Sequence, residues 1–221
     1  MGGLTGRSTP HGISGRYIGE NGNLNRVFLL SPANASGVRA RLILNQRAEF
    51  ELAVRLREEG AAIAEVFGFI SGLYFRGKSA YSNAFAAPPP GVQGSLVITP
   101  GRGLVSPETR ISFGDLQEIA TVPIDLANSR YRDALERDAQ RLSELIPPGC
   151  EVVLLGSIAT AKYLEPLLEI FGSRLVFPSE FVGRGDMSRG GLMLRCAREG
   201  TELEYVSALS APRRGRRPPV L

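Results

Sequence analysis

Four short apolar segments, each followed at once by a loop rich in small residues and proline, constrain the fold of this chain most. They cover residues 26–30 (RVFLL), 95–99 (SLVIT), 151–155 (EVVLL) and 174–177 (RLVF). Apolar runs of this length are typical of strands that are buried on both faces of a parallel sheet. The pattern therefore predicts four strands, each of which ends at a loop of glycine, serine, proline or asparagine.

The segments between these strands have the residue spacing of helices. Apolar residues recur at helical intervals in four stretches, 46–59, 61–86, 129–145 and 158–171, and glycines interrupt the second of them. Strands that alternate with helices imply right-handed crossovers, which align the strands in parallel and cover both faces of the sheet. We expect an α/β three-layer sandwich whose mainly parallel central sheet has about four strands.

The two ends of the chain differ from its middle. Residues 192–196 and 203–208 predict a late antiparallel pair of strands. Residues 1–25 have no hydrophobic period, and residues 211–221 are rich in arginine and proline. We therefore expect a single α/β domain at residues 26–210, between a flexible leader and a basic flexible tail.

The composition argues against several kinds of site. The only histidine is His11, in the leader, so we expect neither a histidine-based metal site nor a Ser-His-Asp triad. No pattern calls for a cofactor, and we expect none. Cys150 and Cys196 lie beside apolar runs and outside any C-x-x-C motif, which predicts unpaired, buried thiols. The sequence has no run of about 18 apolar residues and no secretory signal, so we expect a cytoplasmic protein that does not enter a membrane.

Ligands of open α/β sheets bind at the carboxyl ends of the strands. Four loops follow the predicted strands there, at residues 31–37 (SPANASG), 99–103 (TPGRG), 156–160 (GSIAT) and 178–190 (PSEFVGRGDMSRG). Because right-handed crossovers align the strands, we expect all four loops at one edge of the sheet. This edge is the predicted ligand site.

Two kinds of group in these loops fit an anionic ligand. Gly156 and Ser157, in front of a predicted helix, can offer backbone N–H groups and a hydroxyl, although Ser157 can equally serve as the N-cap of that helix. Arginines among glycines can form two parallel hydrogen bonds to a phosphate. The candidates are Arg102, Arg184 and Arg189. The alternative for Arg184 is a surface ion pair with Asp186.

The remaining loop residues fit recognition of a base or a catalytic role. Ser31 and Asn34 lie in the first loop, where the Asn34 amide can hydrogen-bond a base edge or hold an Asx turn. Glu180 and Asp186 are the acids of the fourth loop and the candidates for a general base or for positioning water. Three aromatic residues can stack on a base or belong to the core, namely Phe177, Phe181 and Tyr163.

The carboxyl-terminal part of the chain resembles uracil-DNA-glycosylase-like domains. LLGSIATAKYLEPL followed by LVFPSEFVGRGDMSRGG is similar in order and spacing to that superfamily, in which a strand ending in G-S precedes one that ends in H-P-S and a DNA-contacting loop. VFLLSPANASG resembles the superfamily's first strand and pocket loop. ITPGRGLVSPETRIS followed by VPIDL is similar to the related domains attached to tRNA-guanine transglycosylase-like proteins.

This resemblance implies a location for the site. It implies that Pro178 and Ser179 stand at the H-P-S position and that residues 183–189 form the loop that follows. The family's first loop carries an acid, as in G-Q-D-P-Y, whereas SPANASG has none, and Phe177 replaces the histidine of H-P-S. The implied function is action on another nucleobase or nucleotide, or binding of it alone, without uracil excision by the usual residues.

The sequence favours a nucleotide- or nucleic-acid-associated α/β protein that binds phosphate and base at the loop edge of its sheet. One alternative is a small-molecule enzyme, such as a nucleotide hydrolase or a glycosyl-transferring enzyme, with Glu180 or Asp186 as its acid. The other is a non-catalytic interaction module whose basic tail engages a partner. A buried cleft with an acid of raised pKa favours an enzyme, and a flat basic edge favours nucleic-acid binding.

The basic tail generates a prediction about salt dependence. Arg213, Arg214, Arg216 and Arg217 equal the whole net charge of +4, so the rest of the chain is close to neutral. If all four neutralise phosphates of duplex DNA, deleting residues 211–221 lowers the magnitude of the slope of log K against log salt by roughly 3.6, whatever the DNA sequence. Fluorescence anisotropy with labelled DNA at several salt concentrations measures this change. Equal slopes for the full-length and truncated proteins would leave the tail a role in solubility alone.

Overall fold

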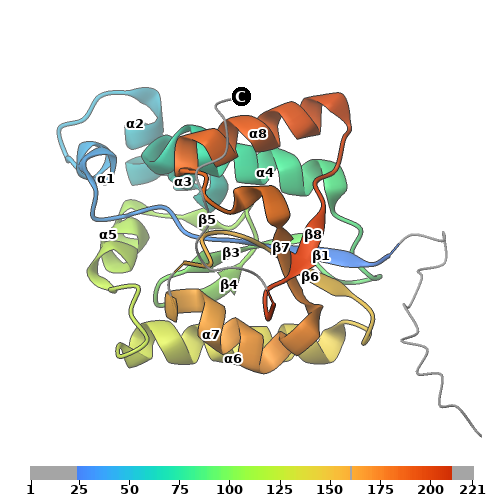
Figure 1. Cartoon of the computed structure of the whole chain (residues 1–221). Helices are drawn as coiled ribbons and strands as arrows, with labels where there is room; N and C mark the ends of the chain where they lie inside the picture. Colours follow the sequence, from blue (N-terminus) through green and yellow to red (C-terminus); the bar gives the residue numbers. More distant parts are fainter. Residues whose placement is uncertain (1–23, 160, 211–221) are drawn as a thin grey trace, which may run out of the picture.

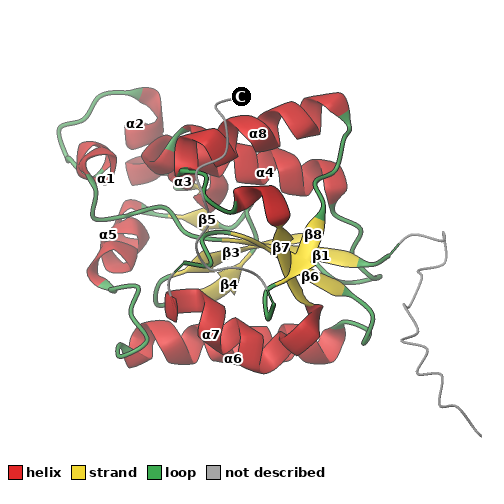
Figure 2. Cartoon of the chain, in the orientation of Figure 1, coloured by secondary structure: helices red, strands yellow, loops and turns green. Residues whose placement is uncertain are grey.

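A six-stranded sheet forms the middle layer of the computed structural model, which describes residues 24–159 and 161–210 (Figure 1; Figure 2). Its order is β4 (Gly103–Val105), β3 (Ser95–Thr99), β1 (Arg26–Leu30), β6 (Glu151–Leu155), β7 (Leu175–Pro178) and β8 (Tyr205–Ser207). The four inner strands are parallel, and the two edge strands pair antiparallel with their neighbours. The predicted three-layer sandwich with a mainly parallel sheet is confirmed.

Helices cover both faces of this sheet (Figure 1). One face carries α3 (Ile63–Ser71), α4 (Leu73–Phe85) and α8 (Asp186–Glu199). The other face carries α6 (Ser129–Leu145) and α7 (Ala161–Phe171). The shorter helices are α1 (Val38–Ile43), α2 (Glu51–Glu58) and α5 (Phe113–Thr121), and a two-stranded sheet joins β2 (Ala61–Ala62) to β5 (Arg110–Ile111). Single 3₁₀ turns at Gly172–Arg174 and Ser179–Phe181 flank β7.

The core is centred on β1 and β6. Residues 27–30 and 152–155 are completely buried, because helices close both faces of these strands. Burying each large apolar side chain contributes about 1.5–3 kcal/mol, so this pair makes a substantial contribution to the stability of the fold. Cys150 and Cys196 are buried and unpaired, which confirms the expectation of two free thiols.

The strand predictions at 26–30, 95–99, 151–155 and 174–177 are confirmed to within one residue. Three of the helical stretches are divided or shortened. Helix α2 begins at Glu51 rather than near residue 46, and the stretch at 61–86 divides at Gly72, whose φ of +59° favours glycine. Helix α7 begins at Ala161 rather than at residue 158.

The late strand predicted at 192–196 is wrong, because these residues belong to α8. Leu192, Met193 and Cys196 are the buried apolar residues of this segment, and their spacing places them on one face of a helix. A short apolar run does not distinguish a strand from a buried helix by itself. The late antiparallel strand is β8 alone, and its partner is β7.

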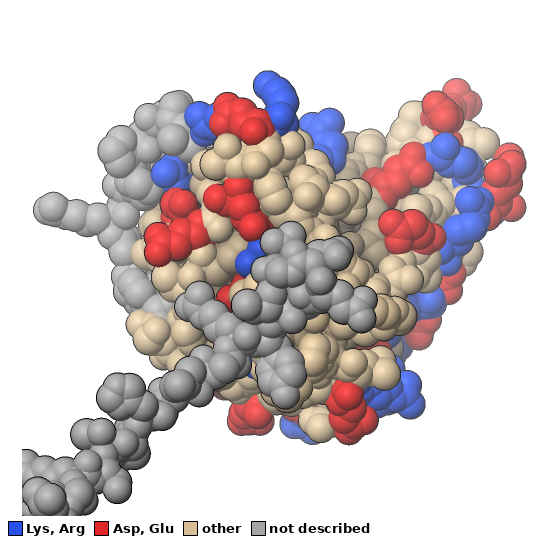
Figure 3. Space-filling view, turned by 90° about the vertical axis from the view of Figure 1, so that its right-hand side faces the viewer, with Lys and Arg blue, Asp and Glu red and all other residues tan. Residues whose placement is uncertain are grey.

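The structure describes no helix that is long and apolar enough to cross a membrane. The predicted leader and tail lie almost entirely outside the described residues. Figure 3 shows the side of the molecule on which β1 begins. Where grey atoms do not cover this side, acidic and basic side chains are interspersed, without an extended patch of either sign. This distribution agrees with the neutral balance expected for the body of the chain.

Two glycines bring α4 and α8 into backbone contact. A Cβ atom on Gly190 would lie 2.7 Å from the carbonyl oxygen of Leu73 and 2.8 Å from the Cα atom of Tyr74. A Cβ atom on Gly77 would lie 2.6 Å from the carbonyl oxygen of Gly190. Gly191, the next residue of α8, has no atom within 4 Å of the same position.

We expect opposite effects from alanine at these adjacent positions of α8. Gly190→Ala should lower the free energy of unfolding by about 1–3 kcal/mol or more, because the backbones of α4 and α8 must separate. Gly191→Ala should raise it by about 0.5–1 kcal/mol, because alanine favours the helix and meets no neighbour. Urea denaturation of both variants measures the difference. Equal effects would contradict the close contact of the two helices.

Candidate functional site

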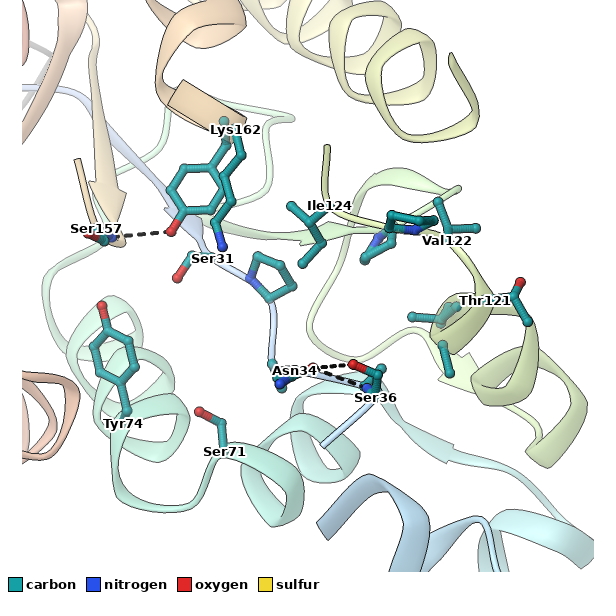
Figure 4. A pocket seen from close by; sticks show the side chains of 18 of the residues that line it. Ser31, Asn34, Ser36, Ser71, Tyr74, Thr121, Val122, Ile124, Ser157 and Lys162 are labelled. Atoms are coloured by element: carbon teal, nitrogen blue, oxygen red, sulfur yellow. Dashed lines mark hydrogen bonds between the residues drawn. The ribbon is translucent and has the colours of Figure 1, made fainter. Parts of the chain in front are cut away.

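A cavity of about 770 Å³ opens at the carboxyl ends of the parallel strands (Figure 4). The chain leaves β1 toward the layer of α3 and α4 and leaves β6 toward α7 on the opposite face. Neighbouring strands whose connections diverge in this way leave a crevice between their loops. The cavity is lined there by Ser31, Pro32, Ala33, Asn34, Ala35, Ser36, Ser71, Tyr74, Pro100, Ile119, Ala120, Thr121, Val122, Pro123, Ile124, Ser157, Lys162, Tyr163 and Asp186.

The prediction that the four loops lie at one edge of the sheet is confirmed, because β1, β3, β6 and β7 are parallel and therefore end at the same edge. Their contributions to the cavity differ. Among the described residues, the first loop supplies six consecutive residues, 31–36, whereas the second, third and fourth loops supply only Pro100, Ser157 and Asp186, respectively. The cavity is therefore centred on the end of β1.

Asn34 forms an Asx turn in the first loop. Its Oδ1 atom accepts hydrogen bonds from the Ser36 backbone N–H at 3.2 Å and from the Ser36 hydroxyl at 2.8 Å. Of the two roles left open by the sequence, the turn is therefore present. The Nδ2 group has no hydrogen-bond partner within the described residues, so it can still donate to a ligand.

Ser31 connects the cavity to a buried lysine. The Lys78 Nζ atom lies 2.9 Å from the Ser31 Oγ atom and 2.6 Å from the Ser31 carbonyl oxygen. Lys78 comes from α4, is 0% exposed and forms no salt bridge among the described residues. Its ammonium group also lies 4.2 Å from the centre of the Tyr74 ring and 5.0 Å from that of Phe75.

Burial lowers the pKa of Lys78 from its ordinary value of 10.5 to about 7. Desolvation is the main cause, because it penalises the charged form and no carboxylate lies close enough to compensate. Asp186 opposes the shift through its negative charge, and Arg189 adds to it. Near neutral pH, a large share of this lysine is an uncharged amine, which makes it a candidate proton acceptor.

Two tyrosines, Tyr74 and Tyr163, line the cavity together with Ser31. The Tyr163 hydroxyl accepts a hydrogen bond from the Ser157 backbone N–H at 3.3 Å. The buried Tyr74 hydroxyl makes no hydrogen bond of normal geometry within the described residues, although the charges of Arg189 and Asp186 act on it. Burial raises the pKa of both phenols, so they remain neutral donors. An unpaired polar atom in a cavity wall suits a ligand, since buried polar groups are normally hydrogen-bonded.

Lys162 supplies a cation to the cavity. Its side chain extends from α7 over the Tyr163 ring, with the Nζ atom 5.6 Å from the ring centre, and it reaches into the cavity (Figure 4). The backbone carbonyl of Lys162 accepts a hydrogen bond from the buried Tyr131 hydroxyl at 2.9 Å, which fixes this turn of α7. Lys162 forms no salt bridge in the described part of the chain, so its charge is available to an anion.

Comparisons of the chain with protein-family models, with curated proteins and with solved structures found no match. The site must therefore be interpreted from its own geometry. No group of three or more metal-ligating side chains gathers among the described residues.

Ser157 is not the N-cap of the following helix. Helix α7 begins four residues later, at Ala161, and the Ser157 hydroxyl accepts a hydrogen bond from the Ala159 backbone N–H at 3.3 Å. That interpretation of Ser157 is wrong because the predicted helix was extended back to residue 158. Gly156 lies behind the cavity wall, where a Cβ atom would stand 2.9 Å from the Ser31 Cβ atom. Its lack of a side chain leaves room for Ser31.

Arg102 and the arginines of the fourth loop lie outside the cavity lining. Arg102 pairs with Asp115 at 2.5 Å and with Glu118 at 3.3 Å. Arg184 donates to the Glu180 carbonyl at 2.9 Å, and Arg189 donates to the Phe181 carbonyl at 2.9 Å. The alternative for Arg184, an ion pair with Asp186, is also wrong, because Asp186 pairs with Arg189 at 3.6 Å.

Five other candidates also lie outside the cavity lining, namely Phe177, Pro178, Ser179, Glu180 and Phe181. Pro178 is buried in β7, and the Ser179 backbone N–H donates to the Glu204 carbonyl at 2.9 Å. The Ser179 hydroxyl donates to the Glu180 carboxylate at 3.1 Å. Phe177 and Phe181 are 1% exposed and belong to the core, whereas Tyr163 lines the cavity.

Sequence reasoning missed Lys78 and Lys162, although the composition holds a signal for them. The chain has 26 basic residues, and these two are its only lysines. Lysine differs from arginine because it can lose its proton when it is buried. A lysine within the apolar stretch 61–86 of an arginine-rich chain is therefore informative.

The depressed pKa of Lys78 predicts a pH-dependent stability. Between pH 7 and about 10.5, the unfolded chain binds one proton more than the folded protein at this residue, so folding becomes more favourable as the pH rises. Lys78→Met removes the titrating group and keeps an unbranched apolar stem. Between pH 7.5 and 9.5, the free energy of unfolding of the unaltered protein should rise by about 2–3 kcal/mol more than that of the variant. Urea denaturation at both pH values measures the gain, and a constant difference would show that Lys78 stays charged.

Proposed function

We propose that the protein is nucleotide- or nucleic-acid-associated and binds one nucleotide unit, its phosphate and its base, in the cavity at the end of β1. The observation that carries the proposal is the placement of Lys162, a cation without a carboxylate partner in the described part of the chain, in a crevice at the carboxyl edge of a parallel sheet. Crevices at this place in α/β sheets are where such ligands bind. A volume of about 770 Å³ lies within the range of small-molecule sites.

The phosphate would lie beside α7. Lys162 offers a point charge of the kind that phosphate-binding sites use, and the Ser157 hydroxyl stands at the end of the neighbouring strand. An ammonium group inside a cavity attracts an anion more strongly than one in open water, because the local dielectric is lower. These two residues replace the arginines that the sequence suggested for this task.

The base would lie toward α4 and the first loop. The Asn34 Nδ2 group and the Tyr74 hydroxyl both lack partners within the described residues, and both can donate to the carbonyl oxygens of a base. Apolar side chains from the segment after α5, Val122, Pro123 and Ile124, complete the opposite wall. An apolar wall with a few oriented polar groups is the usual composition of a small-molecule site.

The relationship to uracil-DNA-glycosylase-like domains also stays a proposal, and it depends on the sequence segments quoted above. The cavity lies at the segments that resemble the superfamily's first loop and G-S strand end, 31–36 and Ser157, which supports it. The segment that resembles the H-P-S position supplies neither Pro178 nor Ser179 to the cavity. The proposal is therefore binding without the family's usual excision residues.

We expect Lys162→Ala to weaken the binding of nucleoside monophosphates by roughly 10- to 100-fold, because it removes a charge-assisted contact worth about 1.5–3 kcal/mol. Binding of the uncharged nucleosides should change little. Isothermal titration calorimetry with the four ribonucleotides and their nucleosides measures both. Arg141→Ala is the matched control, because it removes one positive charge from a side chain that is 71% exposed and outside the cavity.

Equal weakening by Lys162→Ala and Arg141→Ala would contradict the proposed phosphate site, as would the absence of binding to all four nucleotides at millimolar concentration. A short single-stranded oligonucleotide serves as the second ligand. If it binds much more tightly than a mononucleotide and depends equally on Lys162, the ligand is a nucleic acid. If it does not bind, the cavity takes free nucleotides.

A further inference from the structure

The hydroxyl of Ser31 lies between a ligand cavity and a buried amine. Ser31 is 4% exposed and lines the cavity, while Lys78 packs behind it and is not among the lining residues. The Lys78 Nζ atom is within hydrogen-bond distance of the Ser31 Oγ atom, at 2.9 Å. A serine whose hydroxyl touches a base on one side and an open cavity on the other has the arrangement of a nucleophile.

The second contact of Lys78 orients its nitrogen. A neutral amine has two N–H groups and one lone pair, and one N–H group donates to the Ser31 carbonyl oxygen at 2.6 Å. The lone pair can then accept the Ser31 hydroxyl proton. The ring faces of Tyr74 and Phe75 surround the rest of the amine and keep it dry.

Other residues near this pair also fit a reaction at Ser31. Asp186 and Arg189 are the charged groups that act on Lys78, with opposite effects on its pKa, and the buried state of the amine brings that pKa to about 7. The Tyr163 hydroxyl lines the same cavity as Ser31, and Lys162 extends into this cavity. A phenol and an ammonium group are both able to stabilise an oxyanion.

We propose that Ser31 is a catalytic nucleophile with Lys78 as its general base, and that the cavity hydrolyses carboxylic esters. The Ser31 Oγ atom attacks the ester carbonyl carbon and its proton passes to Lys78. When the tetrahedral intermediate collapses, the bond to the leaving alcohol breaks and Lys78 returns the proton to that oxygen. Water then attacks the acyl-serine, which releases the carboxylic acid and restores the Ser31 hydroxyl.

Gly156 supports the position of the nucleophile. A Cβ atom at this residue would lie 2.9 Å from the Ser31 Cβ atom and 3.2 Å from the Ser31 Oγ atom. A larger residue would therefore displace the serine from Lys78. This proposal does not depend on the identity of the ligand as a nucleotide, because it needs only that a small electrophile enters the cavity.

Covalent labelling of the full chain with an alkyl fluorophosphonate tests the nucleophile. Attack by Ser31 forms an O–P bond and expels fluoride, and mass spectrometry locates the modified residue. We expect labelling of Ser31, with a rate that rises with pH to a plateau and has its midpoint near pH 7, because the base must be uncharged. The pH profile is measured on the unaltered protein, so it does not depend on how well any variant folds.

Three variants complete the test. Ser31→Ala should abolish labelling, and Lys78→Met should slow it by about 100-fold or more. Ser106→Ala is the matched control, because Ser106 lies outside the cavity lining and its hydroxyl contacts Glu108; it should be labelled at the normal rate. Release of 4-nitrophenol from 4-nitrophenyl acetate should follow the same order.

Absence of labelling, labelling at another residue, or ester hydrolysis that survives Ser31→Ala would overturn the proposal. Those results are expected if Lys78 only caps the end of β1. Protection of Ser31 by a nucleoside monophosphate would support both this proposal and the nucleotide site. Labelling of Ser31 that no nucleotide slows would support the nucleophile and contradict the nucleotide site, so the two proposals can fail separately.

Discussion

The burial of β1 and β6 against one another is the constraint on which the rest of the structure depends. These strands are covered on both faces, and their connections leave in opposite directions, toward α4 on one side and α7 on the other. The crevice between the two connections is a geometrical consequence of that divergence. The end of β1 consequently lies where polar side chains from both helical layers can meet.

Lys78 imposes a cost that the fold must bear. Removing an ammonium group from water without a carboxylate partner is unfavourable, and neutralising it near pH 7 relieves only part of the penalty. An apolar residue of similar length would fill the same space between α4 and β1 at lower cost. The close approach of α4 and α8 at Gly77 and Gly190 supplies the rigid packing that holds such a group in place.

The four parallel strands could be predicted from the sequence, because each is a short apolar run that ends at a loop of small residues or proline. The edge of the sheet at which these loops lie followed from the parallel order of the strands. The helix α8 could not, because LMLRC fits either period and its position depends on glycines that meet α4 only in the folded chain. Ser31, Asn34, Ser157 and Asp186 were found from loop position. Lys78 and Tyr74 come from α4, and Lys162 from α7, so their approach to Ser31 is a tertiary effect that local patterns do not carry.

The chemistry of the guanidinium group explains why Arg102, Arg184 and Arg189 lie outside the cavity lining. A guanidinium has five donors and cannot lose its proton, so it is most stable where several acceptors surround it. Arg184 donates to the Glu180 carbonyl, and Arg189, in the first turn of α8, donates to the Phe181 carbonyl. Arg102 pairs with two carboxylates on α5. An arginine in a glycine-rich segment thus holds that segment in place through hydrogen bonds. The Lys162 ammonium group stays directed into the cavity, because it makes no hydrogen bond or salt bridge within the described part of the chain.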